Sequence, residues 1–395
     1  MNLPTIQPRP SSPVNKKTRV LFVDHTPILG GAQISLLELL ETVDRDLFDV
    51  AVACSNRCEE FLESAEKTGA KVFVVKFPRL RGNFVSLPLR YIGTTTNLVN
   101  VCRKFKPDII HSNSVRTHIY GATTAKLTRA KAVWTLRDFE FPKRVFTRLV
   151  RWADAVISIS EAIHHNYDGG HNYPHLHIVP NGICAPQFKR SAARSQVREE
   201  FCIPDDAPVA GSVGRMLPWK GQLEFVKAAA KVSSKLPEAR FILMGNVDSL
   251  EYKTEVEELA KELGIGDKVI FPPFRRDILR CMCVFDVLVH TSKEPEPFGR
   301  VLAEGMSVEL PVIASPFGGP AEIIEHGTSG LLVNPEHTDE LAEAIYRVLT
   351  DKAYASRLAA KARQVFDEKY DQAIETKAVE DIYRSIMAEG RKVRK

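Results

Sequence analysis

Two glutamates separated by seven residues, Glu296 and Glu304, form the most informative pattern in the sequence, Glu-Pro-Glu296-Pro-Phe-Gly299-Arg-Val-Leu-Ala-Glu304. Glu296 falls in a loop, where its carboxylate could hold a sugar hydroxyl. The backbone amides of Phe298 and Gly299 begin a helix and can meet a phosphate. Glu304 lies further along that helix, where it could accept both hydroxyls of a ribose. A sugar nucleotide needs these three groups in this order, whereas the alternative is a polar loop followed by a solvated helix face.

A second loop, Val213-Gly-Arg215-Met-Leu-Pro-Trp-Lys220-Gly221, follows a short apolar run and precedes a helical pattern. Arg215 can donate to two phosphate oxygens at once, and Lys220 adds a compact positive charge. Two solvated loop charges are the alternative. Arg215 and Lys220 lie in one loop at the end of a predicted strand, and this shared position favours an anion site.

Two glycine pairs lie at similar strand-to-helix turns. Gly30 and Gly31 would let the backbone approach a ligand, with the Gly31 amide near the start of a helix, although a simple tight turn is the alternative. The spacing is not Gly-x-Gly-x-x-Gly, which weakens a dinucleotide interpretation. Gly318 and Gly319 occupy a comparable turn later in the chain.

The elements that must position these loops are short apolar runs alternating with helical patterns. Most of the runs lack polar alternation, which is typical of strands buried on both faces of a parallel sheet. The helical stretches include 32–43, 222–233 and 250–263. The predicted strands are 19–24, 48–54, 71–75, 108–111, 132–136, 155–158, 177–180, 208–213, 240–244, 268–271, 287–290, 311–314 and 330–333.

This alternation predicts an α/β protein with two doubly wound, Rossmann-like domains that face each other. We expect a disordered leader at 1–17, a first domain at 18–185 and a second domain at 186–371. A helix at about 372–391 should cross back to the first domain. The length of 395 residues allows two domains, and the composition, 44% hydrophobic and 26% charged, excludes a wholly disordered chain.

Together these segments resemble the family-4 retaining glycosyltransferases of the GT-B fold, also called glycosyl transferases group 1. The resemblance spans about Val20 to Tyr383. It rests on the motifs already described, together with Pro180-Asn181-Gly182 and Gly318-Gly319-Pro320-Ala-Glu322.

The resemblance implies a hexosyltransferase-type enzyme that transfers a sugar, with retention, from a nucleotide-diphosphate sugar to a glycan or lipid-linked acceptor. Cell-surface polysaccharide or lipopolysaccharide synthesis is the expected setting. Arg215 and Lys220 would hold the diphosphate, Glu304 the ribose and Glu296 the sugar, with the Gly31 amide facing a phosphate. No metal and no cofactor are expected. A sugar-nucleotide epimerase of the same architecture and a non-catalytic nucleotide-sugar-binding scaffold are the alternatives.

One residue departs from the family pattern. The family usually has His-Asp after a late strand of the first domain, and here Arg137 stands at the histidine position of Trp134-Thr-Leu-Arg137-Asp138. We expect Arg137 to serve catalysis by donating to the sugar or the transferred group. The alternative is an altered or lost activity.

Charge is unevenly divided along the chain. The net charge is +5, yet Lys76–Arg151 contains 16 Lys or Arg residues and three acids. With aromatic residues among these cations, the stretch predicts docking on an anionic membrane surface, with a solvated basic face as the alternative. We find no nucleic-acid recognition motif and expect no nucleic-acid partner. We see no signal peptide or membrane-spanning segment in the sequence and expect a cytoplasmic protein. The basic stretch adds the expectation of peripheral attachment to the inner face of the membrane.

Two metal-like patterns are set aside. Asp44-Arg45-Asp46 matches a short metal signature but precedes a predicted strand instead of ending one. Five histidines between His164 and His177 have no spacing that fixes a zinc geometry. Seven cysteines, most of them single in apolar segments, fit reduced thiols.

Overall fold

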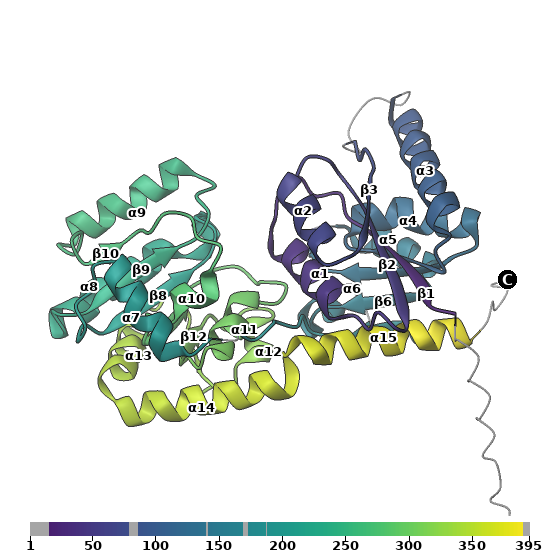
Figure 1. Cartoon of the computed structure of the whole chain (residues 1–395). Helices are drawn as coiled ribbons and strands as arrows, with labels where there is room; N and C mark the ends of the chain where they lie inside the picture. Colours follow the sequence, from purple (N-terminus) through teal and green to yellow (C-terminus); the bar gives the residue numbers. More distant parts are fainter. Residues whose placement is uncertain (1–15, 79–85, 140, 169–172, 187, 390–395) are drawn as a thin grey trace, which may run out of the picture.

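The computed structural model of the chain describes residues 16–78, 86–139, 141–168, 173–186 and 188–389. The described residues form two parallel sheets, each covered by helices, as the alternating pattern predicted (Figure 1). The expected leader, residues 1–17, lies almost wholly outside the described residues.

The first sheet has the strand order β3-β2-β1-β4-β5-β6-β7, and every neighbouring pair is parallel. Its strands are β1 Thr18–Val23, β2 Phe48–Cys54, β3 Lys71–Val74, β4 Ile109–Ser112, β5 Lys131–Leu136, β6 Ala155–Ser158 and β7 Leu176–Ile178. The helices around it are α1 Gly31–Thr42, α2 Glu59–Lys67, α3 Ser86–Phe105, α4 Val115–Thr128, α5 Lys143–Leu149 and α6 Glu161–Asp168, with the short 3-10 helix η1 Val150–Trp152.

The second sheet has the order β10-β9-β8-β11-β12-β13 and is also parallel. Its strands are β8 Val209–Val213, β9 Arg240–Met244, β10 Val269–Ile270, β11 Val287–His290, β12 Val312–Ala314 and β13 Leu331–Leu332. Its helices are α7 Arg190–Glu200, α8 Gln222–Lys235, α9 Leu250–Glu262, α10 Ile278–Met282, α11 Arg300–Ser307, α12 Pro320–Ile323, α13 Thr338–Thr350 and α14 Lys352–Lys369, with the 3-10 helix η2 Pro218–Lys220.

Strand β1 illustrates why the apolar runs are continuous. Val20 and Phe22 belong to a core that includes residues of α1, whereas Leu21 and Val23 belong to a second core that includes residues of α3 and α4. All four side chains are at most 1% exposed. Burying a side chain of this size contributes about 1.5–3 kcal/mol. A strand covered on both faces therefore needs apolar residues at every position.

Two segments cross between the domains and pair with each other. The Ile183 amide donates to the Tyr370 carbonyl at 2.9 Å, and the Gln372 amide donates to the Ile183 carbonyl at 3.1 Å. Helix α15, Gln372–Ala388, then lies along the first domain, where Thr42 and Thr376 share a hydrogen bond of 2.6 Å (Figure 1). Helix α15 therefore packs on the first domain, although it follows α14 of the second domain almost directly in sequence.

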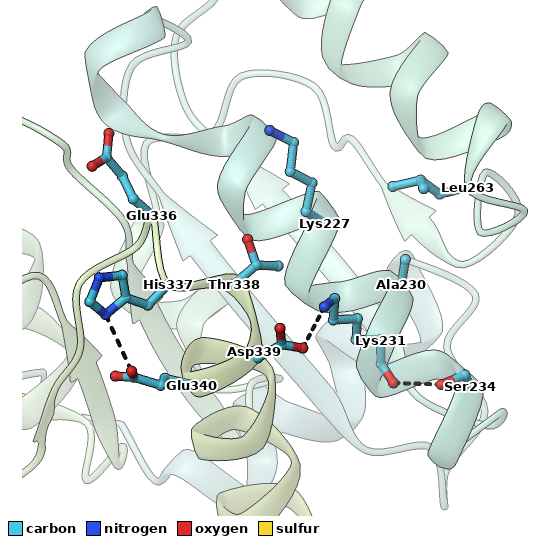
Figure 2. A pocket seen from close by; sticks show the side chains of 10 residues that line it. All are labelled: Lys227, Ala230, Lys231, Ser234, Leu263, Glu336, His337, Thr338, Asp339 and Glu340. Carbon is cyan, nitrogen blue, oxygen red and sulfur yellow. Dashed lines mark hydrogen bonds and ion pairs between the residues drawn. The ribbon is translucent and has the colours of Figure 1, made fainter.

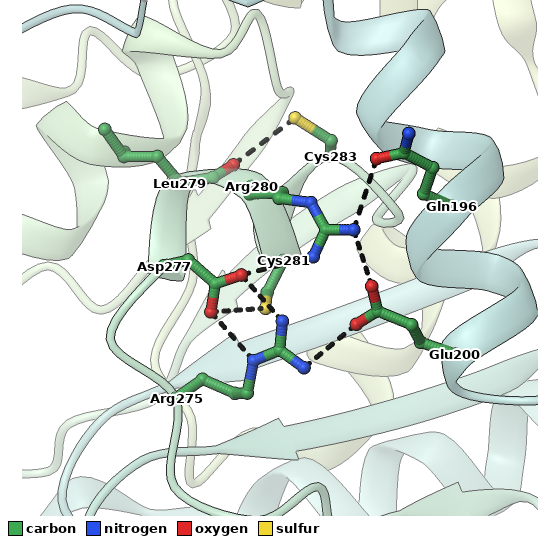
Figure 3. Close-up of polar contacts among 8 residues, drawn as sticks. All are labelled: Gln196, Glu200, Arg275, Asp277, Leu279, Arg280, Cys281 and Cys283. Atoms are coloured by element: carbon green, nitrogen blue, oxygen red, sulfur yellow. Dashed lines mark hydrogen bonds and ion pairs between the residues drawn. The ribbon is translucent and has the colours of Figure 1, made fainter.

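A polar cluster fixes α7 to the second domain (Figure 3). Glu200 at the end of α7 accepts from Arg275 at 2.9 Å and from Arg280 of α10 at 2.5 Å. Asp277 also accepts from Arg275, and these arginines hold its pKa well below the usual range although burial acts in the opposite direction. All the residues of this cluster lie in the second domain. Its ion pairs therefore hold α7 to α10 and the segment before it.

Candidate active site

The carboxyl ends of β8 and β11 bring two of the predicted loops together. These strands are neighbours, although β9 and β10 come between them in sequence, so the strand order reverses here. Open parallel sheets bind ligands at such a switch point. Thr291 Oγ1 donates to the Lys220 carbonyl at 3.0 Å, and the Lys293 amide donates to the Trp219 carbonyl at 2.8 Å. The loops after β8 and β11 therefore form one surface.

Gly221 permits this close approach. Its φ is +72°, and a Cβ atom at this position would collide with the carbonyl of Thr291. A side chain is strained at this φ and has no room here. The glycine that follows Lys220 is thus required by the packing of one loop on the other.

The carboxylate of Glu296 is the centre of the site. Its Oε1 lies 2.6 Å from Lys220 Nζ and 2.5 Å from His290 Nε2, and Ser292 Oγ also donates to it. Among the described residues, no group donates to Oε2. Burial raises the pKa of Glu296, but electrostatic interaction with His290 and Lys220 outweighs burial and holds the pKa well below its usual range. The carboxylate is therefore ionised and has one oxygen left for a hydroxyl.

The structure thus joins two residues predicted from separate motifs, Lys220 and Glu296. It also adds His290 and Ser292, which the sequence analysis missed as site residues. His290 is the last residue of a strand in which the other residues are apolar. A polar residue at the carboxyl end of a buried strand was the signal that could have found it.

Arg215 points elsewhere. Its Nε donates to Asp248 Oδ2 at 2.5 Å, and the Asp248 carboxylate also accepts from Asn246 at 2.6 Å. The Arg215 side chain is 56% exposed. An exposed ion pair contributes only about 0–1 kcal/mol. Arg215 can therefore exchange Asp248 for a phosphate at little cost, although it does not contact Lys220 or Glu296 here.

Gly299 starts α11 with a φ of +96°, next to the buried ring of Phe298. The loop is held from the other side by the second glycine pair, because the Gly319 amide donates to the Glu296 carbonyl at 2.9 Å. A Cβ atom on Gly318 would collide with that carbonyl group. The predicted glycine turn after β12 therefore supports the loop that carries Glu296.

Glu304 is joined to the first domain through Arg300. Arg300 Nε lies 2.8 Å from Glu304 Oε1, and Nη2 lies 2.8 Å from Oε1 of Glu38 in α1. Arg300 Nη1 also donates to the Gly182 carbonyl at 3.4 Å. A Cβ atom added to Gly31 would lie 3.7 Å from Arg300 Cδ. The predicted residues Gly31 and Glu304 therefore meet on either side of Arg300, which the sequence analysis did not identify.

Arg137 is buried within the first domain. Its guanidinium donates to Asn113 at 2.9 Å, to Asn181 at 2.7 Å and to Ser35 at 3.2 Å, and the residue is 9% exposed. Burial lowers the pKa of Arg137, against the opposing effect of Glu375. Ser35 lies in α1, so these bonds hold the helix that begins at the Gly31 loop. Within the described residues Arg137 contacts none of the other predicted site residues, and its catalytic role stays a prediction.

Glu322, the last residue of the second glycine motif, has a structural role. Its carboxylate accepts from the amides of Glu161 and Ala162 at 2.9 and 2.6 Å, at the start of α6 in the other domain. Unpaired amides at a helix start favour such a carboxylate. Arg276 and Glu60 form another ion pair between the domains. The segments that carry the candidate site are thus positioned against the first domain at several points.

Other features do not add to this site. A groove of about 760 Å³ is lined mainly by residues of α8 and α13. Figure 2 shows these side chains, with Lys231 paired with Asp339. It contains none of the predicted residues. In the described part of the chain no group of three or more His, Cys, Asp or Glu residues is placed to hold a metal ion. The Asp44 amide donates to Glu380 of α15 at 2.8 Å, which connects the set-aside Asp-x-Asp segment to helix packing.

Two doubly wound domains, with a polar site at the switch point of the second sheet, match the GT-B fold of glycosyltransferases. The chain belongs to the family-4 glycosyltransferases. The family model "Glycosyltransferase Family 4" matches residues 29–185, and "Glycosyl transferases group 1" matches residues 193–365. These matches confirm the family resemblance and the expectation of a glycosyltransferase enzyme.

Individual relatives agree with this assignment. An uncharacterized glycosyltransferase of Methanocaldococcus jannaschii is 24% identical over 91% of this chain and 95% of its own length. A UDP-Gal:alpha-D-GlcNAc-diphosphoundecaprenol alpha-1,3-galactosyltransferase of Escherichia coli is 25% identical over 86% of this chain and 89% of its own. The structure of Anabaena HepE in complex with UDP and glucose superposes with a TM-score of 0.81 at 26% identity, over 93% of this chain and 100% of that one. The fold prediction is confirmed.

Proposed function

We propose that this glycosyltransferase takes its sugar from a nucleotide diphosphate and transfers it with retention of anomeric configuration. The observation that carries the proposal is the Lys220–Glu296–His290 group at the β8/β11 switch point, where a cation, an ionised carboxylate and a helix start lie together. The similarity to Anabaena HepE, whose structure contains UDP and glucose, supports a nucleotide-sugar donor.

Each residue has a defined task in this proposal. Lys220 and Arg215 neutralise the diphosphate, and the amides at Phe298 and Gly299 add donors at the start of α11. Glu304 accepts the ribose hydroxyls, and the free Oε2 of Glu296 accepts a sugar hydroxyl. Charge that develops on the leaving diphosphate meets these fixed donors, which is the main catalytic effect. The acceptor attacks on the face from which the diphosphate leaves, and that phosphate takes its proton. No metal or cofactor is required by this scheme.

Arg137 acts on this site from within the first domain. Its bonds to Asn113 and Ser35 fix the start of α1, and the Gly31 amide there would face the donor phosphate. The Asn113 side chain also donates to the carbonyl of Ala32 at 3.2 Å. A guanidinium at this place adds positive charge beneath the loop, where the usual family histidine would contact the sugar directly.

The acceptor proposed for this chain is a glycan or a lipid-linked glycan in cell-surface polysaccharide or lipopolysaccharide synthesis. The names of several relatives support it, including the galactosyltransferase of Escherichia coli and a lipopolysaccharide 1,2-N-acetylglucosaminetransferase of Salmonella typhimurium that is 28% identical over 49% of this chain. The acceptor named for the Escherichia coli relative, GlcNAc-diphosphoundecaprenol, carries a diphosphate next to its sugar.

The basic stretch 76–151 supports a place at the cytoplasmic membrane face. Exposed apolar side chains accompany its cations: Leu89 and Ile92 of α3 lie within the stretch and Trp152 of η1 directly follows it, each more than half exposed. No helix among the described residues is long and apolar enough to cross a membrane. Sedimentation with anionic and neutral vesicles tests this part, because electrostatic docking requires stronger binding to the anionic vesicles. Equal binding to both would contradict it.

A panel of UDP, GDP, ADP and CMP and their sugars tests the donor assignment by thermal shift. A ligand at 100 times its dissociation constant stabilises the folded state by about 2.7 kcal/mol. Lys220→Met should abolish the shift, whereas Lys227→Met in the groove of Figure 2 should retain it. Indifference to every nucleotide would refute the donor site.

Product analysis then separates the competing functions. A donor that is interconverted without acceptor indicates an epimerase, and a donor that binds without transfer or hydrolysis indicates a scaffold. Transfer with retained configuration, read from the anomeric proton of the product, supports the proposal.

A further inference from the structure

A cavity of about 470 Å³ opens at the carboxyl edge of the first sheet, between the loops after β2 and β3 and the helix α3. Its volume lies in the range of about 300–1,000 Å³ that small-molecule sites occupy. Three cations line it, Arg57, Lys76 and Arg90, and the described residues that line it include no carboxylate. The remaining lining groups are mostly small or polar, such as Asn56 and Thr94.

Two of the cations have no partner in the described part of the chain. Neither the Arg57 guanidinium nor the Lys76 ammonium takes part in an ion pair or a side-chain hydrogen bond there. Like charges that share a cavity repel each other, and an anion that enters removes this repulsion. Arginine and lysine are the side chains that bind phosphate groups most effectively. Both side chains are exposed, so an anion of phosphate type that entered the cavity could reach them.

The cavity is physically connected to the loop that follows β1. Arg116, at the start of α4, donates to the Phe77 carbonyl at 3.0 Å and to the Pro78 carbonyl, both on the cavity wall. Burial lowers the pKa of His25, and the positive charge of Arg116 lowers it further, against the effect of Asp24. His25 begins the loop that leads to Gly31. The Oγ atom of Ser114, two residues before Arg116, lies 3.2 Å from His25 Nδ1, so the start of α4 connects the cavity wall to this loop.

The strand order gives the approximate distance between the cavity, at the end of β3, and the loop after β1. β2 is adjacent to β1, and β3 is the next strand along. Neighbouring strands lie about 4.8 Å apart, so the end of β3 is about 10 Å from the end of β1. A group bound in the cavity is therefore close to the place where the donor sugar would meet its acceptor.

We propose that this cavity binds a phosphate or diphosphate ester carried by the acceptor. The inference rests on the proposed function, because it assumes that the acceptor approaches over the first domain. Arg57 and Lys76 would contact the phosphate oxygens directly, and Arg116 would add charge from behind the wall. The short separation suits a phosphate one or two sugar units from the reacting hydroxyl.

Calorimetric titration with inorganic pyrophosphate tests the assignment. The wild-type protein should bind two equivalents, one in the cavity and one at the donor loop. Arg57→Gln/Lys76→Gln should lose one equivalent, or bind it at least tenfold more weakly. Arg215→Gln/Lys220→Gln should lose the other equivalent. The control is Arg103→Gln/Lys104→Gln, which removes the same charge from the exposed last turn of α3 and should change affinity less than twofold.

The outcomes separate this inference from the proposed function. Unchanged binding in Arg57→Gln/Lys76→Gln, with loss in Arg215→Gln/Lys220→Gln, overturns the cavity assignment and retains the donor site. The reverse pattern supports the cavity and overturns the donor assignment. Equal losses in the control and in Arg57→Gln/Lys76→Gln also overturn the cavity assignment, because the effect would then come from net charge. Circular dichroism melting of each variant confirms that it is folded.

Two further probes identify where the phosphate comes from. If Arg57→Gln/Lys76→Gln weakens binding to phosphatidylglycerol vesicles but the control does not, the cavity binds a lipid headgroup phosphate. If vesicle binding is unchanged but binding of sn-glycerol 3-phosphate is weakened, the phosphate belongs to the soluble or glycan part of the acceptor. If neither probe is affected, the proposal is wrong.

Discussion

Replacing Arg300 by leucine removes the one cation shared by Glu38 and Glu304. All three side chains are 14–16% exposed, and both ion-pair distances are 2.8 Å. Breaking a buried pair by removing one partner costs about 3–5 kcal/mol, because the remaining charge is uncompensated. Two carboxylates lose the same partner, but each is slightly exposed and can be hydrated, so the costs for the two do not add. We therefore expect Arg300→Leu to lower the free energy of unfolding by about 3–5 kcal/mol near neutral pH.

The sign of the pH dependence follows from Glu38. Burial already raises its pKa, and Arg300 is the largest opposing influence, so its removal raises the pKa further. A carboxylate with a raised pKa binds a proton in the folded state more readily than in the unfolded state. Stability then falls as pH rises from the unfolded value of about 4.3 through the raised folded value. The deficit of Arg300→Leu should thus be smaller at about pH 5 than at about pH 8.

Urea unfolding at both pH values, followed by circular dichroism, measures this effect. Lys231→Met provides the control, because its ion pair with Asp339 is 47% and 88% exposed and its loss should cost less than about 1 kcal/mol. Adding Glu38→Gln to Arg300→Leu removes one uncompensated charge and should recover part of the loss. A deficit below about 1 kcal/mol, or the same deficit at both pH values, would refute the interpretation of Arg300 as a buried charge partner.

Three further predictions concern single positions. Glu296→Gln should lower the transfer rate at least a hundredfold while nucleotide binding, read by thermal shift, is retained; loss of both would place Glu296 in folding. Burial raises the pKa of Glu375 to about 7, so the free energy of unfolding should fall as pH rises from about 4.3 to about 7. Glu375→Gln should flatten that fall in urea unfolding, because Gln does not titrate, while its side-chain oxygen can still accept from the Gly182 amide. Gly221→Ala should lower the melting temperature and weaken donor binding, since the new Cβ atom would meet the carbonyl of Thr291 at a φ of +72°; an unchanged affinity would mean that the two loops move independently.

The contacts around Arg300 and Glu322 give the two domains a defined relation in this structure. Arg300 joins α11 to α1, and Glu322 accepts amides at the start of α6. Both residues lie in motifs of the candidate site. A ligand that bound Glu304 would compete with Arg300, whose other partner is in the first domain, so we expect binding there to be linked to domain position.

Much of the fold could be predicted from local sequence. The predicted strands 48–54, 155–158, 240–244 and 287–290 have the bounds observed in the structure. Strands buried on both faces need unbroken apolar runs, so their signal is local and strong. The shortest strands, such as β10 with two residues, were predicted too long, because apolar residues beside a strand are also buried when they pack on neighbouring helices.

The site was predictable only in part. Lys220, Glu296, Phe298 and Gly299 lie in loops whose glycines and charges follow strand ends, and these positions are visible in the sequence. The partners of the charged groups were not visible. Arg215 is paired with Asp248, and Arg137 with Asn113 and Asn181, because these residues follow different strands whose carboxyl ends meet at one edge of a sheet.

The sequence alone therefore determined the two doubly wound domains, the family and the loops that carry chemical groups. Apolar periodicity and turn residues are local properties, and they do not depend on what a loop meets across the molecule. Only the tertiary structure decided which oxygen of Glu296 is left free, and that Arg300 pairs both with Glu304 and with Glu38, which lies 262 residues before Arg300 in the chain. The Glu296 contacts depend on which strands are neighbours in the second sheet, and the Arg300–Glu38 contact depends on how the two domains meet. No periodic pattern in the sequence encodes either arrangement.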